Sequence, residues 1–224
     1  MITVLYENEE MLAVVKPVGV VSERRPDGKG FPDMLEKFCW ERGYQHPIYP
    51  VHRLDKDVSG VMLFAKTVEA SSMLTAIITS GDMEKEYLAV VEGCPQLSQD
   101  RLFDLLYHDQ AKNKTYVVKR PRRGVRDASL SYEVMQQDGE TALLHIWLHT
   151  GRTHQIRVQF ASRKHPVVGD RRYGSRMPAT GLALFSHRIT FVHPHTRKIM
   201  SFCAYPTPEQ TWERYAEKIQ EEQK

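Results

Sequence analysis

Apolar residues recur at helical spacing after Thr67, in the clearest pattern of the chain. The intervals of three and four fall on Ala70, Met73, Leu74, Ile77 and Ile78. This spacing gathers the apolar side chains on one face of a helix. The Thr67 hydroxyl can cap the start of that helix, and Gly81 can end it.

Three further helices are expected from weaker patterns. Two of them cover 33–42, which Gly43 would close, and 155–162. The third lies at the C-terminus, where Thr207-Pro208-Glu209-Gln210 has the pattern of a capping box. We therefore expect this last helix to begin at Thr207, with Pro208 in its first turn.

Short apolar runs bounded by turn residues predict strands over 4–6, 12–15, 61–65, 87–91, 115–118, 129–135, 142–148, 182–191 and 198–204. Asp138-Gly139 predicts a tight hairpin between two of them. Many hairpin-joined strands with a few helices outside favour an α+β fold, a mostly antiparallel mixed sheet with flanking helices. The chain is expected to form one domain, 1–224, because 224 residues suit one large domain or one domain with two lobes.

Composition excludes several classes of protein. With 41% apolar and 26% charged residues, the chain is neither a disordered segment nor a coiled coil. The three cysteines lie far apart, which argues against a disulfide framework or a structural zinc site. No apolar run approaches the ~18 residues of a membrane span, and the N-terminus is acidic. We expect a cytoplasmic protein without membrane contact.

Positive charge gathers in the second half of the chain, although the net charge is only +3. The stretches 111–126 and 152–176 each hold seven Lys or Arg residues, with Asp170 as their single acid. Such clusters are typical of a polyanion-binding surface, and the alternative is a pair of solvated loops. The candidate residues for binding such a polyanion are Lys119, Arg120, Arg122, Arg123, Arg152, Arg171 and Arg172.

Two segments concentrate groups that can do chemistry. In the first, 50–60, ionisable residues including Arg53 and Asp55 stand between two apolar runs. Taken alone, an Arg-x-Asp pair in a loop is more often a surface ion pair. In the second, 148–157, a strand ends and a polar turn opens a helix, where free backbone N–H groups can bind anions.

Together with their surroundings, these segments resemble the RluA-type pseudouridine synthases. The resemblance rests on motifs in the family's order: Lys16-Pro17-Val18-Gly19, His52-Arg53-Leu54-Asp55 followed by Ser59-Gly60, Lys85 to Gly93, Gly151 to Val158, and His165 to Gly174. It runs from about Val4 to Ala204. Val58 and Gln159 depart from the usual residues, and the S4-type RNA-binding domain of many relatives has no counterpart among these 224 residues.

The resemblance implies an enzyme that isomerises uridine in RNA to pseudouridine in a central RNA-binding cleft, without metal or cofactor. Asp55 would be the catalytic carboxylate, attacking or deprotonating beside the anomeric carbon. Arg157 would pair with it, since a guanidinium fork binds both oxygens and stays charged. Tyr87 would stack on the flipped uracil or help remove the C5 proton, with Ile156 against it. Arg53 would fill the gap left by the flipped base.

Other interpretations stay open at this stage. Taken alone, Tyr87 is more often a core aromatic of its strand, and His52 and His154 are expected to support the backbone rather than transfer protons. The chain could be an inactive RNA-binding domain of the same fold. It could also be a metal-dependent RNA hydrolase, although Asp55 and Asp57 lack a third acid for Mg²⁺. The RNA target, an rRNA or tRNA stem-loop, is not specified, and a monomer is expected.

Overall fold

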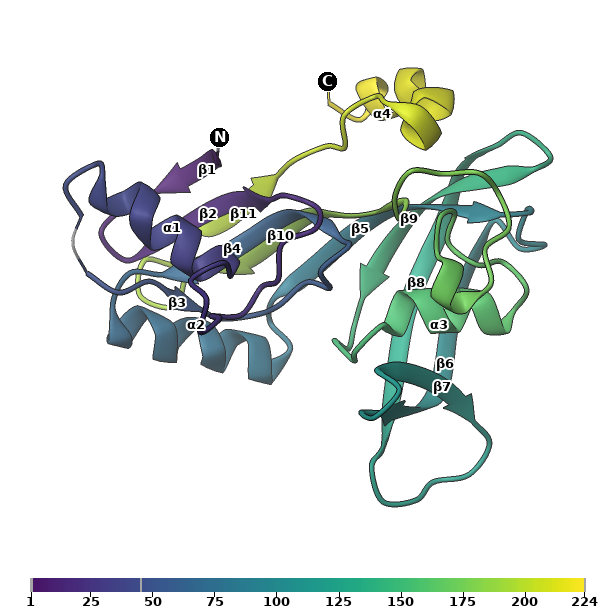
Figure 1. Ribbon diagram of the computed structural model, residues 1–224, viewed down its shortest axis with the longest axis horizontal. Helices are drawn as coiled ribbons and strands as arrows, with labels where there is room; N and C mark the ends of the chain where they lie inside the picture. The colour runs from purple at the N-terminus through teal and green to yellow at the C-terminus, as the bar shows by residue number, and fades with distance from the viewer. Residues whose placement is uncertain (1, 45, 224) are drawn as a thin grey trace. The chain divides into compact units, whose positions relative to one another are not determined.

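The computed structural model describes residues 2–44 and 46–223 and divides them into two compact units (Figure 1). Unit 1 consists of Met1–Lys85 and Ser186–Tyr205. Unit 2 consists of Glu86–Phe185 and Pro206–Lys224. Each unit has its own strands and helices, and we describe each by itself.

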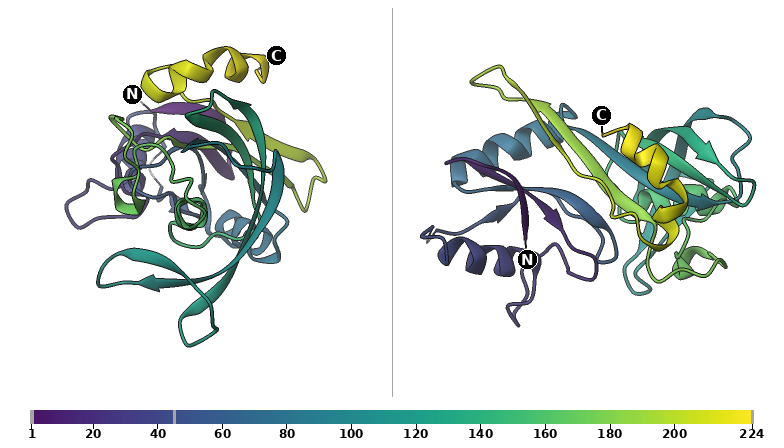
Figure 2. Two further views of the ribbon diagram at one scale, coloured as in Figure 1. Left: turned by 90° about the vertical axis from the view of Figure 1, so that its right-hand side faces the viewer. Right: turned by 90° about the horizontal axis from the view of Figure 1, so that it is seen from above.

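Unit 1 is built on a sheet of short strands. Its order is β1-β2-β4-β10, with β3 paired to β4 and β11 to β10. The strands are β1 (Thr3–Glu7), β2 (Met11–Lys16), β3 (Tyr49–Pro50), β4 (Ser59–Ala65), β10 (Leu184–Val192) and β11 (Ile199–Cys203). β10 enters the unit at Ser186 and forms with β11 the long yellow-green hairpin of Figure 2.

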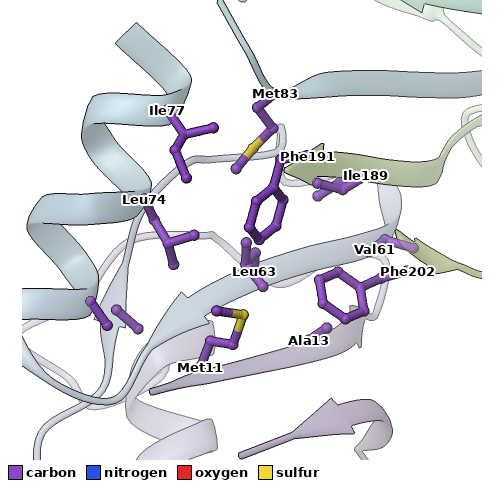
Figure 3. Packing of buried hydrophobic residues seen from close by; sticks show 12 residues of the cluster. Met11, Ala13, Val61, Leu63, Leu74, Ile77, Met83, Ile189, Phe191 and Phe202 are labelled. Carbon is purple, nitrogen blue, oxygen red and sulfur yellow. The ribbon is translucent and has the colours of Figure 1, made fainter. Parts of the chain in front are cut away.

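Helix α2 (Val68–Ser80) covers one face of this sheet. Its Leu74 and Ile77 enter a core with side chains from four strands, among them Met11, Ala13, Val61, Leu63, Ile189, Phe191 and Phe202 (Figure 3). The Thr67 hydroxyl accepts a hydrogen bond from the Ala70 N–H, and the left-handed Gly81 ends the helix. The predicted helix and both of its end residues are therefore confirmed.

Helix α1 (Phe31–Trp40) lies on the opposite face, as Figure 1 shows. Phe31 packs edge-on against Phe64 of β4, with ring centroids 5.7 Å apart. On the same strand, Gly60 has φ +122°, and a Cβ there would come within 2.2 Å of the Ser186 carbonyl oxygen. Only glycine fits, because β4 and β10 approach too closely for a side chain.

Unit 2 contains an antiparallel sheet of order β5-β9-β8-β6-β7. Its strands are β5 (Glu84–Glu92, from Glu86 in this unit), β6 (Gln99–Asp109), β7 (Lys114–Val118), β8 (Val125–Gln137) and β9 (Thr141–Leu148). The predicted hairpin at Asp138-Gly139 joins β8 to β9. β6 was not predicted. The α+β class with a mostly antiparallel sheet and flanking helices is confirmed.

The helix α3 (Gln155–Ser162) has the predicted bounds and covers one face of this sheet. Its Val158 packs with Leu106 of β6 and Ala128 of β8, and its Phe160 lies 5.3 Å from the ring of Tyr132. We call this the inner face of the unit 2 sheet, and the opposite side its outer face. A single 3₁₀ turn, η1 (Arg171–Tyr173), follows α3.

The C-terminal prediction needs a correction. The chain forms a 3₁₀ segment, η2 (Gln210–Tyr215), and then α4 (Ala216–Glu221), and the N-cap of η2 is Glu209 without a side-chain cap bond. Thr207 is therefore not the cap, because its backbone carbonyl accepts from the Glu209 N–H in a turn before the helix. Buried Tyr215 and Ile219 do anchor the segment. In the described part of the chain, no helix is long and apolar enough to cross a membrane.

Candidate active site

The Asp55 loop lies in unit 1, between β3 and β4. Buried Ser22 clamps the residue just before Asp55: its hydroxyl accepts from the Leu54 N–H at 3.0 Å and donates to the Leu54 carbonyl at 2.7 Å. A turn follows, in which the Val58 N–H donates to the Asp55 carbonyl at 3.1 Å. The backbone on both sides of this carboxylate is thus fixed by hydrogen bonds.

Lys16 braces the same loop from the end of β2. Its fully buried ammonium group donates to three backbone carbonyls, those of Pro17 (2.8 Å), Val20 (2.8 Å) and Lys56 (3.3 Å). Burial lowers the pKa of Lys16 to about 8, against the opposing attraction of the Asp57 and Asp55 carboxylates. Lys16 therefore ties the Lys-Pro-x-Gly turn to the Asp55 loop.

His52 has a structural role in this loop. Its Nε2 accepts a hydrogen bond from the Leu63 N–H of β4 at 3.0 Å, which requires an unprotonated nitrogen. Burial, with a smaller contribution from the nearby Lys85 charge, lowers the pKa of His52 to about 3. The ring is therefore neutral near pH 7 and supports the backbone, as expected from the sequence.

Arg53 points to the surface of unit 1. Its guanidinium binds the Glu23 carboxylate at 2.5 Å, and both side chains are more than half exposed. Surface pairs of this kind contribute at most about 1 kcal/mol, so the arginine is readily released. The structure thus gives Arg53, two positions before Asp55, an accessible, movable side chain.

Tyr87 lies in unit 2, on the inner face of the sheet. It pairs directly with Ile146 of β9, which pairs with Tyr132 of β8, and Tyr132 contacts Phe160 of α3. Directly opposed residues of antiparallel strands point to the same face. Tyr87 therefore shares its face with the helix that contains Ile156, and both side chains are buried.

Arg157 makes a buried two-bond fork with Asp170. The Nε–Oδ2 distance is 2.6 Å and the Nη2–Oδ1 distance is 3.0 Å. Asp170 also caps η1 by accepting from the Tyr173 N–H. Gly169 positions this acid: its φ is +82°, and a Cβ would come within 2.0 Å of the Gly181 carbonyl oxygen.

Tyr173 completes the surroundings of the arginine. The Arg157 guanidinium lies over its ring, 5.2 Å from the centroid. The Tyr173 hydroxyl accepts from the Thr115 N–H at 2.8 Å and lies 2.9 Å from His154 Nδ1. A guanidinium held by a carboxylate fork and an aromatic face keeps one orientation and its charge.

The polar turn before α3 differs from a free anion site. The Gln155 side chain accepts from the Arg152 N–H at 3.0 Å and donates to the Ser129 carbonyl at 3.1 Å. His154, at the N-cap, has φ +56° and no side-chain cap bond. One of the N–H groups predicted to bind an anion is therefore already used inside the protein.

Comparison with known proteins identifies the family. The family model for RNA pseudouridylate synthase matches residues 10–162. The chain belongs to this family. It is 32% identical over 211 residues to the ribosomal large subunit pseudouridine synthase C of Buchnera aphidicola, covering 90% of this chain and 66% of the relative. It is 36% identical over 181 residues to a ribosomal large subunit pseudouridine synthase D of Xanthomonas campestris, covering 79% and 53%.

Solved structures support the fold of this RNA pseudouridylate synthase family member. The human RNA pseudouridylate synthase domain containing 4 superposes with a TM-score of 0.77 at 17% identity, covering 97% of this chain and 93% of that one. At this identity the likeness concerns the fold. The chain spans about 65% of the length of several curated relatives.

The predicted RNA-binding residues are exposed in unit 2. Lys119, Arg120, Arg122 and Arg123 lie in the loop between β7 and β8. Arg152 donates to the Asp127 carbonyl at 2.9 Å, Arg171 to that of Ser175 at 3.4 Å, and Arg172 to that of Asn113 at 2.9 Å. These three arginines hold loops as well as presenting charge.

Sequence reasoning assigned no role to Lys16, Ser22, Asp170 or Tyr173, although three of them lie in quoted motifs. The signal for Asp170 was its position as the single acid among seven basic residues. Among residues 2–44 and 46–223, no three His, Cys, Asp or Glu side chains gather to hold a metal. The pairing of Asp55 with Arg157 and the packing of Ile156 against Tyr87 stay predictions.

Proposed function

We propose that this chain isomerises specific uridines in structured RNA to pseudouridine. The observation that carries the proposal is that the family match over 10–162 includes Asp55, Tyr87 and Arg157. Each has a defined local setting: a loop clamped by Ser22 and Lys16, the inner face of the unit 2 sheet, and a buried carboxylate fork. The two units would act as one catalytic domain.

Asp55 would provide the catalytic carboxylate. In pseudouridine formation the N1–C1′ bond breaks, the uracil turns, and C5 bonds to C1′ before the C5 proton leaves. A carboxylate can attack or deprotonate beside the anomeric carbon while the base is detached. The hydrogen bonds around Leu54 and Lys56 would hold this group still during the reaction.

Arg157 and Tyr87 would act on the same nucleotide from unit 2. The guanidinium would pair with the Asp55 carboxylate and keep it charged, while Asp170 and Tyr173 fix its orientation. Tyr87 would stack on the detached uracil or assist removal of the C5 proton, and Ile156 would pack beside it. Buried side chains on one sheet face suit a site that excludes water.

The target base must leave its stack to react. A base cannot rotate and rebond inside a helix, so the nucleotide must be flipped out. Arg53 would occupy the gap, because a planar guanidinium stacks on neighbouring bases. Its exposed pair with Glu23 would open for this step at small cost.

RNA would be the partner, held by the exposed basic residues of unit 2: Lys119, Arg120, Arg122, Arg123, Arg152, Arg171 and Arg172. Phosphate contacts fix the register of the RNA but do not read its sequence. The target would be an rRNA or tRNA stem-loop, and two relatives are named for the ribosomal large subunit. The enzyme would work in the cytoplasm as a monomer, without metal or cofactor.

Pseudouridine mapping of cellular RNA with and without this protein tests the proposal. We expect one or a few pseudouridine sites that appear only when the protein is present. Purified protein should form pseudouridine at the same sites of isolated RNA, even in excess chelator. An RNA-binding protein without catalysis would leave every site unchanged. A metal-dependent hydrolase would instead shorten the RNA, and only without chelator.

A further inference from the structure

Cations lie over aromatic rings in three places along β6 and β7. The guanidinium of Arg101 is 4.7 Å from the ring centroid of Phe103. That of Arg122 is 4.7 Å from the centroid of Tyr107. The ammonium of Lys114 is 5.8 Å from the centroid of Tyr116 and 5.4 Å from that of Tyr173, which packs on the other face of the sheet. All of these distances lie within the range of cation–π attraction.

The three aromatic residues share the outer face of the unit 2 sheet. Side chains alternate along a strand, so Phe103 and Tyr107 of β6 point away from Leu106, which packs with α3 on the inner face. Tyr116 pairs directly with Tyr107 and therefore joins them. We call Phe103, Tyr107 and Tyr116 the aromatic row.

Two of the three rings of the row are exposed to solvent. Phe103 is 63% exposed and Tyr116 is 37% exposed. β7 pairs with β6 only from Leu105 onward, so Phe103 lies beyond the end of β7. On the opposite edge of β6, Phe103 pairs with β8. A large exposed ring on a rigid strand is a ready contact for a flat apolar partner.

The charge around the row favours a polyanion. Arg101, Lys114 and Arg122 lie over its rings, and the loop 119–126 beside it has five basic residues, against exposed Asp127, which lies on the same face opposite Leu105. Rings alternating with cations are the combination by which proteins hold single-stranded nucleic acid, stacking bases while the cations meet phosphates. An apolar protein surface would not match this charge.

We propose that the aromatic row binds unpaired bases of an RNA strand on the face of unit 2 opposite α3. The inference rests on the proposed function only in taking RNA as the partner. It adds a second contact region, remote from the inner face that holds Tyr87. Nucleotides flanking the modified stem-loop would stack there, and the basic loop would hold their phosphates.

Variants of Phe103 test the row, because this exposed side chain can change without disturbing the core. The probe is a fluorescein-labelled single strand of twelve uridines, compared with a duplex of the same length. We expect Phe103→Leu to weaken single-strand binding about fivefold or more, since stacking on one base is worth at least about 1 kcal/mol. Phe103→Trp should bind at least as tightly as the wild type.

Two measurements make the result decisive. Ile199→Ala is the matched control, because Ile199 is 74% exposed on β11 and should leave binding unchanged. Photocrosslinking with 5-iodouridine should label the peptides that contain Phe103 or Tyr116. Single-strand affinity within twofold of wild type in Phe103→Leu would overturn the proposal. The proposal would also be overturned if Phe103→Leu lost self-association but kept its RNA affinity, because the row would then bind a second copy of the chain.

The outcome is separable from that of the catalytic proposal. Because the row lies on the outer face, Phe103→Leu should raise the RNA concentration needed for half-maximal rate but leave turnover at saturating RNA unchanged. Bound and crosslinked RNA without any pseudouridine would support the row while contradicting the catalytic function. If Phe103→Leu formed pseudouridine and bound RNA with wild-type affinity, the result would support the catalytic function and contradict the row.

Discussion

The carboxylate of Asp170 binds the guanidinium of Arg157 through two hydrogen bonds inside unit 2, at 2.6 and 3.0 Å. Both side chains are almost fully buried. The acid reaches this position through the Gly169 turn, and the arginine is the third residue of α3. A buried fork of this kind fixes an arginine more firmly than a surface pair does.

Asp170→Asn should therefore destabilise the chain and lower its activity. Removing one charge of a buried pair costs about 3–5 kcal/mol, because the other charge stays in a medium of low polarity. Urea unfolding measures this change. Glu221→Gln, which breaks the exposed pair with Lys218, is the control and should cost less than about 1 kcal/mol. Similar effects of the two substitutions would refute the structural role of the fork.

His52→Gln should remove an acid sensitivity of the wild type. The pKa of His52 is about 3 in the folded chain and 6.5 ordinarily, so between these values the unfolded state binds a proton that the folded state does not. Stability is therefore lost as the pH falls below about 6.5, by up to about 1.4 kcal/mol per pH unit. Glutamine keeps an acceptor for the Leu63 N–H but does not titrate.

The free energy of unfolding of both proteins, measured by urea titration from pH 7 to pH 4, checks this. The wild type should lose stability more steeply than His52→Gln as the pH falls. Parallel curves would show that burial does not keep the histidine neutral.

Replacing Lys119, Arg120, Arg122 and Arg123 with Gln should weaken RNA binding. Each lost phosphate contact should make the slope of log affinity against log salt shallower by about 0.7 on single-stranded RNA. A salt titration measures the slope. Turnover at saturating RNA should stay near wild type. The control replaces four exposed basic residues of unit 1, Lys29, Lys37, Arg197 and Lys198. If the slope of log affinity against log salt were the same in both variants, the loop would be a solvated surface that does not contact RNA phosphates.

The elements that the sequence predicts well are those with local causes. The helix from Val68 to Ser80 follows from an apolar stripe, a hydroxyl cap and a terminal glycine, all within one segment. The hairpin at Asp138-Gly139 follows from its turn residues. Asp55, Tyr87 and Arg157 could be predicted as site residues because each lies within a contiguous sequence motif of the family.

The features that escaped prediction depend on tertiary contacts. β6 does not alternate apolar and polar residues in sequence, because Phe103 and Tyr107 lie on the outer face, while Asp104 lies on the inner face beside buried Leu102 and Leu106 and binds Arg163. The prediction of an N-cap at Thr207 was wrong because the chain forms a turn there before the helix begins. Asp170 lies thirteen residues from Arg157, and only the fold brings the two charges together.

Tritium release from RNA labelled at uridine C5 tests the central claim most directly. The wild type should release tritium as pseudouridine forms, and Asp55→Asn should bind the RNA but release none, because the amide can act neither as nucleophile nor as base. Asp57→Asn, an exposed acid of the same loop, should release at the wild-type rate. Release by Asp55→Asn near the wild-type rate would contradict the account.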